Sequence, residues 1–396
     1  MKSKTVVLSW SLLLGMFASI QASNAQDSLR ISLDEAEQQF LRKNFVLLAA
    51  KYRVAEADAA IIQAKLYPNP NLSVNQGLYN QDTKKWFDLS SSGETALSLQ
   101  QVIVLAGKRN RSIDLARINS RLSTYQFYDL LRTLRYQLRS AFYSLYYLQE
   151  PIRVYDREIS SLQSLLASYT EQYGKGNIAF KELARLQALQ FSLQNERLDL
   201  VRQAVDHQSD LRLLISDTTV RPIAPVVTGD GSTAPDISKL RYQDLVDSAM
   251  SNRYDLKASS TQIDYARSNL SLQKAMRVPD LTLGANYDRA GSYVRNFNAL
   301  SVAIDLPFWN RNQGNIRAAE GQVQESQQLE SQSRMQVISD IDRAYRELTD
   351  ADQLYRQAAQ QFTGDYERLL DGILKGYENR TISLLEFIDY YETYKN

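Results

Sequence analysis

The chain has 396 residues, long enough for more than one domain, and its 46 Lys and Arg against 45 Asp and Glu leave a formal net charge of +1. This balance produces no overall field that would attract nucleic acid, so no nucleic-acid partner is expected. The chain contains no cysteine and a single histidine, His207, which excludes thiol catalysis, disulfides and Cys/His zinc sites.

Residues 1–25 have the pattern of a cleaved secretory signal. Lys2 and Lys4 precede an apolar run from Val6 to Ile20, and the small residues up to Ala25 mark the expected cleavage position. No cysteine follows that position, so a lipoprotein anchor is not expected. No later segment approaches the roughly 18 consecutive apolar residues of a membrane-spanning helix. We therefore expect an exported protein that can cross a membrane only as a β-barrel.

The remainder of the chain contains an internal repeat. Four anchors recur in the same order, and the spacing between matched positions changes by only a few residues along the chain. The matched pairs are Pro70–Val74 with Pro279–Leu283, Lys43–Leu47 with Asn252–Leu256, Gly107 with Gly314, and Tyr173–Ile178 with Tyr377–Ile382. The sequence thus predicts a first repeat at 26–215, a linker rich in proline and glycine at 216–240, and a second repeat at 241–396.

Each repeat opens with a helical segment that ends before a proline. A capping-box sequence, SLDE, begins the predicted helix Ser32–Leu66, and its counterpart in the second repeat is predicted at Tyr242–Met276. Pro70 and Pro279 then mark two helix-to-strand transitions, because proline disfavours helix at the preceding residue.

After each transition, polar and apolar residues alternate along two short segments, as in β-strands with one wet and one apolar face. The polar positions are Ser73, Asn75, Ser98, Gln100, Thr282, Asn286, Ser301 and Asp305. A pair of half-buried hairpins in a soluble domain would show the same alternation, although an isolated hairpin is marginally stable in water. Together with the predicted secretory signal, the pattern favours a membrane barrel.

A very long helix follows each hairpin. Lys108–Tyr173 carries apolar residues at spacings of three and four, and its only proline, Pro151, predicts a kink or a break. The counterpart is predicted from Asn315 to about Tyr377, and both lengths are typical of coiled coils. Glycines after Tyr173 allow a reversal into an antiparallel return helix at Ala179–Leu214.

The ordered set of these motifs resembles the TolC family of outer membrane efflux proteins. The motifs are Pro70–Val74, Pro279–Leu283, Gln101–Arg109, Leu306–Asn310 and the two reversals at Tyr173–Ile178 and Tyr377–Glu386. The sequence from Ile382 to Phe387 also resembles the heavy-metal efflux branch.

The resemblance implies a mainly α protein with a small β part. Long antiparallel coiled-coil helices would form a trimeric periplasmic α-barrel, and four strands per chain would join a shared, ~12-stranded barrel in the outer membrane of a Gram-negative bacterium. It also implies a passive exit duct that docks onto a periplasmic adaptor protein and an inner-membrane pump. The resemblance does not decide whether the cargo is a metal ion, a drug or a protein.

Residues at the two helical reversals are the candidate functional positions. Three-fold symmetry would turn Glu182, Glu386 or Asp389 into a ring of carboxylates, which favours cations. Tyr377 and Arg380 lie where the family keeps contacts that hold the tips shut. The turn residues expected to dock the adaptor are Gly174, Gly176, Asn177, Asn379 and Thr381. The alternative is that these charges lie on the solvated surface of a coiled coil.

Two departures from the family pattern concern the second reversal. Arg380 occupies the place that Gly176 has in the first reversal, and the helix after Ile382 is shorter than the first return helix. The second departure indicates either a truncated product or another segment that completes the wall of the α-barrel.

A periplasmic coiled-coil scaffold or adaptor without a pore is the alternative function, although no extra segment is available to cover its hairpins. An enzyme is not expected, because the chain has one histidine, no cysteine and no phosphate-binding glycine loop; no cofactor or metal ligand set is predicted.

Overall fold

The computed structural model describes residues 28–219, 221–227, 237–291, 293–361, 369, 372–373, 375–377, 379 and 381–395. The predicted secretory signal, part of the predicted linker and Arg380 lie outside these residues. The chain divides into two compact units, one of Met1–Phe45, Thr133–Ala234 and Gln361–Asn396, and a second of Val46–Arg132 and Pro235–Gln360. Each unit takes segments from both sequence repeats, so the repeat and the compact unit are different divisions of the chain.

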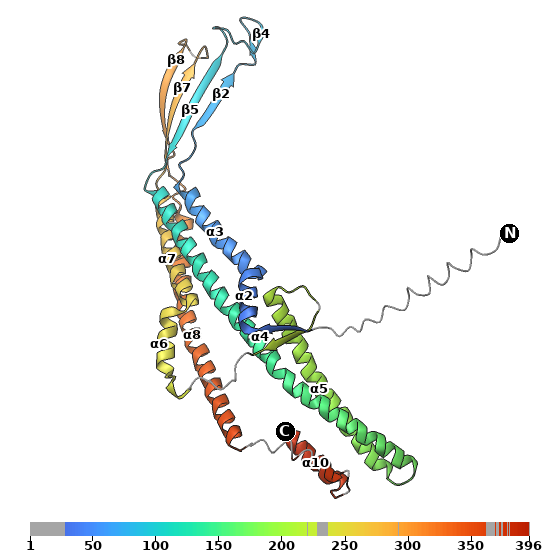
Figure 1. The fold of residues 1–396 in the computed structure, drawn as a ribbon. Coiled ribbons are helices and arrows are strands. Elements are labelled where there is room, and N and C mark those ends of the chain that lie inside the picture. Colours follow the sequence, from blue (N-terminus) through green and yellow to red (C-terminus); the bar gives the residue numbers. More distant parts are fainter. Residues whose placement is uncertain are drawn as a thin grey trace, which may run out of the picture. The chain divides into compact units, whose positions relative to one another are not determined.

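The second unit contains a four-stranded antiparallel sheet. Its strands are β2 (Asn71–Gln76), β5 (Thr95–Ile103), β7 (Leu281–Asp288) and β8 (Phe297–Ile304), in the order β2-β5-β7-β8 (Figure 1). The hairpins of the two repeats therefore join edge to edge, through β5 and β7. The sequence pattern did not indicate a second small hairpin, β3 (Tyr79–Asn80) with β4 (Lys85–Trp86), which lies in the loop between β2 and β5.

Helices of the second unit lead into and out of this sheet. They are α3 (Phe45–Lys65), the first part of α4 (Lys108–Gly174), α6 (Tyr242–Asn252), α7 (Tyr254–Ala275) and α8 (Gln313–Gln361), with a short 3-10 turn, η1 (Ile237–Lys239). The prediction of a long helix from position 315 is confirmed as far as Gln361. The part of that prediction between 362 and 368 falls on residues that the structure does not describe.

The prediction of one continuous helix at the start of each repeat is wrong. The first is divided into α2 (Leu33–Lys43) and α3 at Asn44, and the second into α6 and α7 at Arg253. Both residues have extended backbone, with φ/ψ of −61°/116° at Asn44 and −62°/130° at Arg253. Since the sequence repeat aligns these two positions, the break is a feature that the two halves share.

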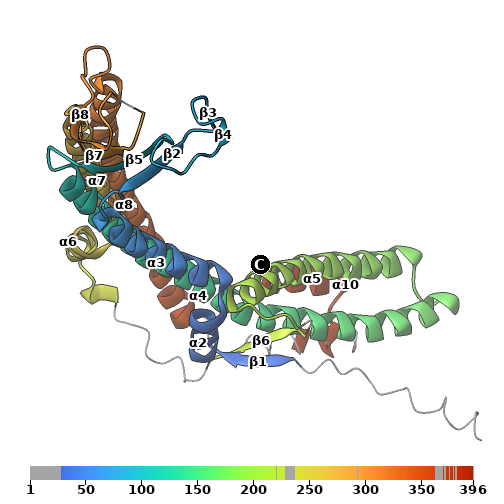
Figure 2. The same cartoon turned by 90° about the horizontal axis from the view of Figure 1, so that it is seen from above.

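The first unit contains the C-terminal part of α4, from Thr133 onward. There α5 (Phe180–Ile215) lies alongside the C-terminal part of α4 in both views (Figures 1 and 2). The predicted return helix is thus confirmed. Helix α4 is assigned as helix through Pro151, which excludes the predicted break there. The last described helix of the chain is α10 (Leu384–Lys395).

A short parallel pair of strands in the first unit corrects the prediction of an irregular linker. Strand β1 (Leu29–Ser32) pairs with β6 (Ile223–Val226), which lies inside the predicted linker (Figure 2). Parallel pairing requires a partner far away in the sequence, so local turn residues gave no signal of it. Ser32 ends β1 and caps α2, and both hydrogen bonds of its predicted capping box with Glu35 are present.

Candidate functional site

The sheet of the second unit separates apolar from polar side chains. Its register places Leu97 opposite both Val74 and Tyr287, and Leu283 opposite Val302, so the apolar positions share one face. That face is uncovered in the single chain: the exposed fraction is 89% for Leu300, 68% for Val302 and 66% for Leu72. An apolar face of this extent requires a covering partner or an apolar medium.

The opposite face of the same sheet is polar, and its side chains lie close to one another. Ser98 lies opposite both Ser73 and Asn286, and Asn286 Nδ2 donates to Ser301 Oγ at 3.2 Å. Gly284 lies beside Ser301, where an added Cβ would approach the Ser301 hydroxyl within 2.3 Å. The predicted polar positions lie on this face, except that β8 ends at Ile304, before Asp305.

Both edges of the sheet are open within the described residues. The outer strands, β2 and β8, each pair with one neighbour, β5 and β7 respectively. Unpaired strand edges are templates for association with another strand. Because the sheet has an even number of alternating strands, β2 and β8 run in opposite directions and can pair with each other in two copies of the chain.

The predicted transitions at Pro70 and Pro279 join helices to this sheet: α3 ends at Lys65 and β2 begins at Asn71, while α7 ends at Ala275 and β7 begins at Leu281. The contacts that hold these junctions were not predicted. Asp280 Oδ1 accepts hydrogen bonds from the Leu105 backbone N–H at 2.9 Å and from Lys108 Nζ at 2.7 Å.

In the first repeat, an arginine holds the corresponding junction. Arg109 donates to the Lys65 carbonyl at 2.7 Å and stacks over the Tyr67 ring, with 4.2 Å between the guanidinium carbon and the ring centroid. The signal for these contacts in the sequence was the GKR motif after the hairpin, where both Lys108 and Arg109 lie.

At the first helical reversal, glycine is required at one position. Gly176 has φ of +78°, in the left-handed region that side chains disfavour, and its N–H donates to the Tyr173 carbonyl at 2.9 Å. Gly174 is the last residue of α4, and the Asn177 N–H donates to the Gln172 carbonyl at 2.9 Å. All three predicted turn residues therefore lie in the α4–α5 turn.

The second reversal uses side-chain hydrogen bonds. The Thr381 N–H and hydroxyl both donate to the Gly376 carbonyl at 2.8 Å, and the Asn379 N–H donates to the Lys375 carbonyl at 2.9 Å. The predicted turn residues Asn379 and Thr381 thus lie in this turn.

Glu386 has a local structural partner. Its carboxylate accepts a hydrogen bond from the Ser383 N–H at 2.7 Å, and its own N–H donates to Ser383 Oγ at 3.3 Å, which caps α10. The Ser383 hydrogen bonds hold the pKa of Glu386 below its usual range. Asp389, one turn further along, is exposed. The carboxylate rings at Glu182, Glu386 and Asp389 stay a prediction.

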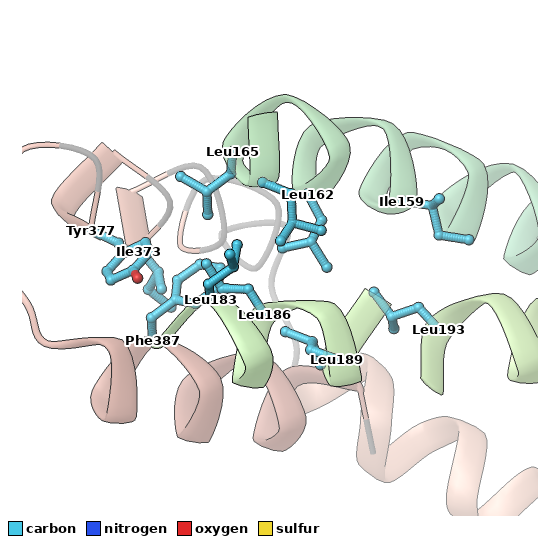
Figure 3. Close-up of a cluster of buried hydrophobic side chains, with 11 residues drawn as sticks. Ile159, Leu162, Leu165, Leu183, Leu186, Leu189, Leu193, Ile373, Tyr377 and Phe387 are labelled. Carbon is cyan, nitrogen blue, oxygen red and sulfur yellow. The ribbon is translucent and has the colours of Figure 1, made fainter. Parts of the chain in front are cut away.

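Tyr377 lies inside an apolar cluster rather than on a surface. The cluster joins α4, α5 and the segment around α10 (Figure 3). Its members are Ile159, Leu162, Leu165, Leu166, Leu183, Leu186, Leu189, Leu193, Ile373, Tyr377 and Phe387. The Tyr377 ring stacks between Tyr169 and Phe387, with centroid distances of 5.7 Å and 4.7 Å.

The Tyr377 hydroxyl is buried within this cluster. The exposed fraction of Tyr377 is 4%, and its hydroxyl makes no hydrogen bond among the described residues. Burial raises the pKa of Tyr377 well above its usual value, and the neighbouring Tyr169 and Glu182 act in the same direction. Glu182, another predicted tip residue, directly precedes Leu183, which belongs to the same cluster as Tyr377. The gating role stays a prediction.

A sequence profile of the family described as "Outer membrane efflux protein" matches residues 36–216 and 245–389, which together form most of the chain. The chain belongs to this family. The two matched segments lie almost entirely within the two predicted repeats. The family consists of channel-type efflux proteins rather than enzymes.

The sequence of this outer membrane efflux protein is similar to those of other export proteins. The cobalt-zinc-cadmium resistance protein CzcC of Cupriavidus metallidurans is 23% identical over 349 residues, which cover 87% of this chain and 79% of CzcC. The pyoverdine export outer membrane protein OpmQ of Pseudomonas putida is 25% identical over 304 residues, which cover 71% of this chain and 62% of OpmQ.

Solved structures share the fold of this efflux protein. The CmeC outer membrane channel of Campylobacter jejuni matches 91% of this chain and 80% of its own, with a TM-score of 0.72 and 15% identity. CusC matches 91% of this chain and 86% of its own, with a TM-score of 0.62 and 17% identity.

Helical spans and metal clusters are not found in the part of the chain that the structure describes. No helix there has both the length and the apolar character needed to cross a membrane. Among the same residues, no three acidic or histidine side chains are grouped as a metal site would require.

Proposed function

We propose that this protein is the outer membrane exit duct of a tripartite efflux system and works as a homotrimer. The observation that carries this proposal is the four-stranded sheet, with its uncovered apolar face, its polar opposite face and its two open edges. Three copies paired through β2 and β8 would close a ~12-stranded barrel without edges, with lipid outside and water inside.

The long helices support the periplasmic part of the proposal. Helix α4 has 67 residues, and at about 1.5 Å per residue it would extend for roughly 100 Å. Such helices in a trimer would form an α-barrel whose reversals, at Gly174–Asn177 and Asn379–Thr381, dock onto a periplasmic adaptor that connects to an inner-membrane pump. Transport through the duct would be passive, since the pump supplies the energy.

Divalent metal ions are the cargo that we propose first. CzcC is described as a cobalt-zinc-cadmium resistance protein and matches a larger share of this chain than OpmQ does. Export of a small organic molecule is the second candidate, because OpmQ is described as a pyoverdine export protein. A strain that lacks this protein should become more sensitive to Co²⁺, Zn²⁺ and Cd²⁺; unchanged sensitivity to all three would reject the metal cargo.

Two neighbouring substitutions in β8 test the duct itself. Val302→Arg places a charge on the apolar face, where it would cost about 2–4 kcal/mol in the middle of a bilayer. Ala303→Arg places the same charge on the polar face. We expect the first variant to lose heat-modifiable trimers in the outer membrane fraction.

The second variant should keep its trimers and alter ion conductance in a planar bilayer. Wild-type protein found as a monomer in the periplasmic fraction, without conductance, would support the alternative of a scaffold or adaptor and reject the duct.

A further inference from the structure

A hollow lies beyond the end of the sheet that is remote from the helices. Its volume is about 390 Å³, and it is lined by Ser91, Arg289, Arg295 and Asn296. These residues come from the loop before β5 and from the connection between β7 and β8, at the far end of the strands from Pro70 and Pro279 (Figure 1). None of them takes part in the polar face of the sheet or in the helical reversals.

The strand register places this hollow on the apolar side of the sheet. The Arg289 N–H donates to the Thr95 carbonyl at 3.0 Å, which continues the pairing of Leu97 with Tyr287 by one step. Alternation along β5 and β7 therefore puts Arg289 on the same face as Leu97 and Tyr287. The Asn296 N–H donates to the Arg289 carbonyl at 3.0 Å and its Oδ1 accepts from the Tyr287 hydroxyl at 2.9 Å, so the Asn296 side chain lies on the same face.

The hollow presents hydrogen-bond donors that the described residues do not use. Arg289 Nη1 donates to the Leu89 carbonyl at 2.8 Å, which fixes the guanidinium, while its Nε and Nη2 make no bond among those residues. The exposed Arg295 guanidinium likewise has no partner among them. Asn296 Oδ1 accepts from the Tyr287 hydroxyl at 2.9 Å, which leaves its amide N–H groups as donors.

Two carboxylates of this region lie toward the other face. Asp288 pairs with Ala96 in the register of the polar face, and its Oδ1 accepts from the Gly291 N–H at 2.8 Å. The Glu94 carboxylate also lies beside Gly291. A third carboxylate, that of Asp88, lies in the loop that Arg289 contacts, and it accepts hydrogen bonds from Thr83 Oγ1 at 2.5 Å and the Ser90 N–H at 3.0 Å. Among the described residues neither arginine forms an ion pair, so their charges stay available on the apolar side.

We propose that this hollow binds the phosphate group of a membrane lipid whose acyl chains lie along the apolar face. Guanidinium groups match phosphate oxygens in paired hydrogen bonds, and basic residues at a membrane surface attract anionic headgroups. A lipid is favoured over free phosphate because the hollow adjoins exposed apolar side chains, which a free anion would not contact. The inference rests on the proposed placement of that face against lipid.

The test uses the full chain in vesicles of phosphatidylcholine with a minor fraction of phosphatidic acid. After extraction and purification, the ratio of phosphatidic acid to phosphatidylcholine that stays bound is measured by mass spectrometry. We expect enrichment of phosphatidic acid on the wild type and a reduction on the order of fivefold in Arg295→Gln. Arg289→Gln should reduce it as well.

Arg277→Gln is the matched control. Arg277 is an exposed arginine before the opposite end of β7, so its substitution removes the same charge far from the hollow. Equal loss in this control, or no enrichment on the wild type, would overturn the proposal. Release of the bound lipid by inorganic phosphate, but not by chloride at equal ionic strength, would assign the hollow to the free anion and reject the lipid.

Flotation of the same vesicles separates this inference from the proposed function. Wild-type protein that fails to float with pure phosphatidylcholine vesicles contradicts the outer membrane duct. Protein that floats with them but shows no preference for phosphatidic acid contradicts the phosphate site alone.

Discussion

Arg253 shows how one residue can hold a helix joint in the second unit. It ends α6 with extended backbone, and its guanidinium forms ion pairs with Asp255 at 2.5 Å and Asp340 at 3.3 Å. Burial acts to raise the pKa of Asp255, but the hydrogen bonds and charge of Arg253 outweigh it and hold the pKa below its usual value. The ion pair thus fixes the start of α7 relative to α8.

Asp255→Asn should lower the free energy of unfolding by about 1–3 kcal/mol at pH 7, because a hydrogen bond to a charged partner is lost. Since the folded-state pKa of Asp255 is lowered, its contribution is present above the unfolded value of 3.8 and is lost as the pH falls through the folded pKa. Thermal unfolding of wild type and Asp255→Asn should show a smaller difference in stability in strong acid than at pH 7.

The control is Asp342→Asn, which removes an exposed ion pair with Arg346 on the same helix, α8. It should change stability by less than about 1 kcal/mol at either pH. A difference between wild type and Asp255→Asn that is independent of pH would show that the ion pair is not the cause.

The α4–α5 reversal is an element whose geometry depends on one backbone angle. An added Cβ meets no atom within 4 Å at Gly176 or at Gly174, but only Gly176 has a positive φ. Gly176→Ala should therefore cost about 1–2 kcal/mol from backbone strain. Gly174→Ala lies in helical backbone and should be neutral or slightly stabilising. Melting temperatures of the two variants check this, and equal effects would contradict it.

Elements with local signals were predictable, and elements with distant partners were not. The Ser32–Glu35 capping box, α4 and α5 follow from residues within a few positions of one another. The break at Asn44 depends on a hydrogen bond of 2.9 Å from its amide to the carbonyl of Leu214, which no local pattern encodes. The parallel pair of β1 and β6 was missed for the same reason.

The candidate site likewise has features that the sequence predicted and features that it did not. Alternation predicted the two faces of the sheet, and the backbone preference of glycine predicted the turn at Gly176. The burial of Tyr377 between Tyr169 and Phe387 could not be predicted, since it needs side chains from three segments. The hollow gave no motif, because its arginines and the loop of Ser91 come from segments 199 residues apart, as the contact of Arg289 with Ser90 shows.

For the whole molecule, the proposed trimer depends on pairing between the open edges of the sheet. The chain has no cysteine, so introduced cysteines report pairing without background. Ser73→Cys on β2, combined in turn with cysteine at Ala299, Ser301 or Ala303 on β8, should give covalent dimers and trimers on oxidation. A bond within one chain is excluded, because three strand spacings of about 4.8 Å exceed the reach of a disulfide.

In the control, Ser98→Cys on the inner strand β5 is combined with the same β8 cysteines in place of Ser73→Cys. This variant should run as a monomer on a denaturing gel. Absence of covalent oligomers with all three β8 positions would contradict closure through these edges.

The shared joint of the two repeats is held by different forces in each half. At Asn44 a neutral amide meets a carbonyl, whereas at Arg253 the contact is between full charges. Added salt leaves the first kind of contact almost unchanged and weakens the second only in part, because the side chains of Arg253 and Asp255 are 16% and 27% exposed. Of the two joints, the one at Arg253 is therefore the one whose stability should vary, modestly, with ionic strength.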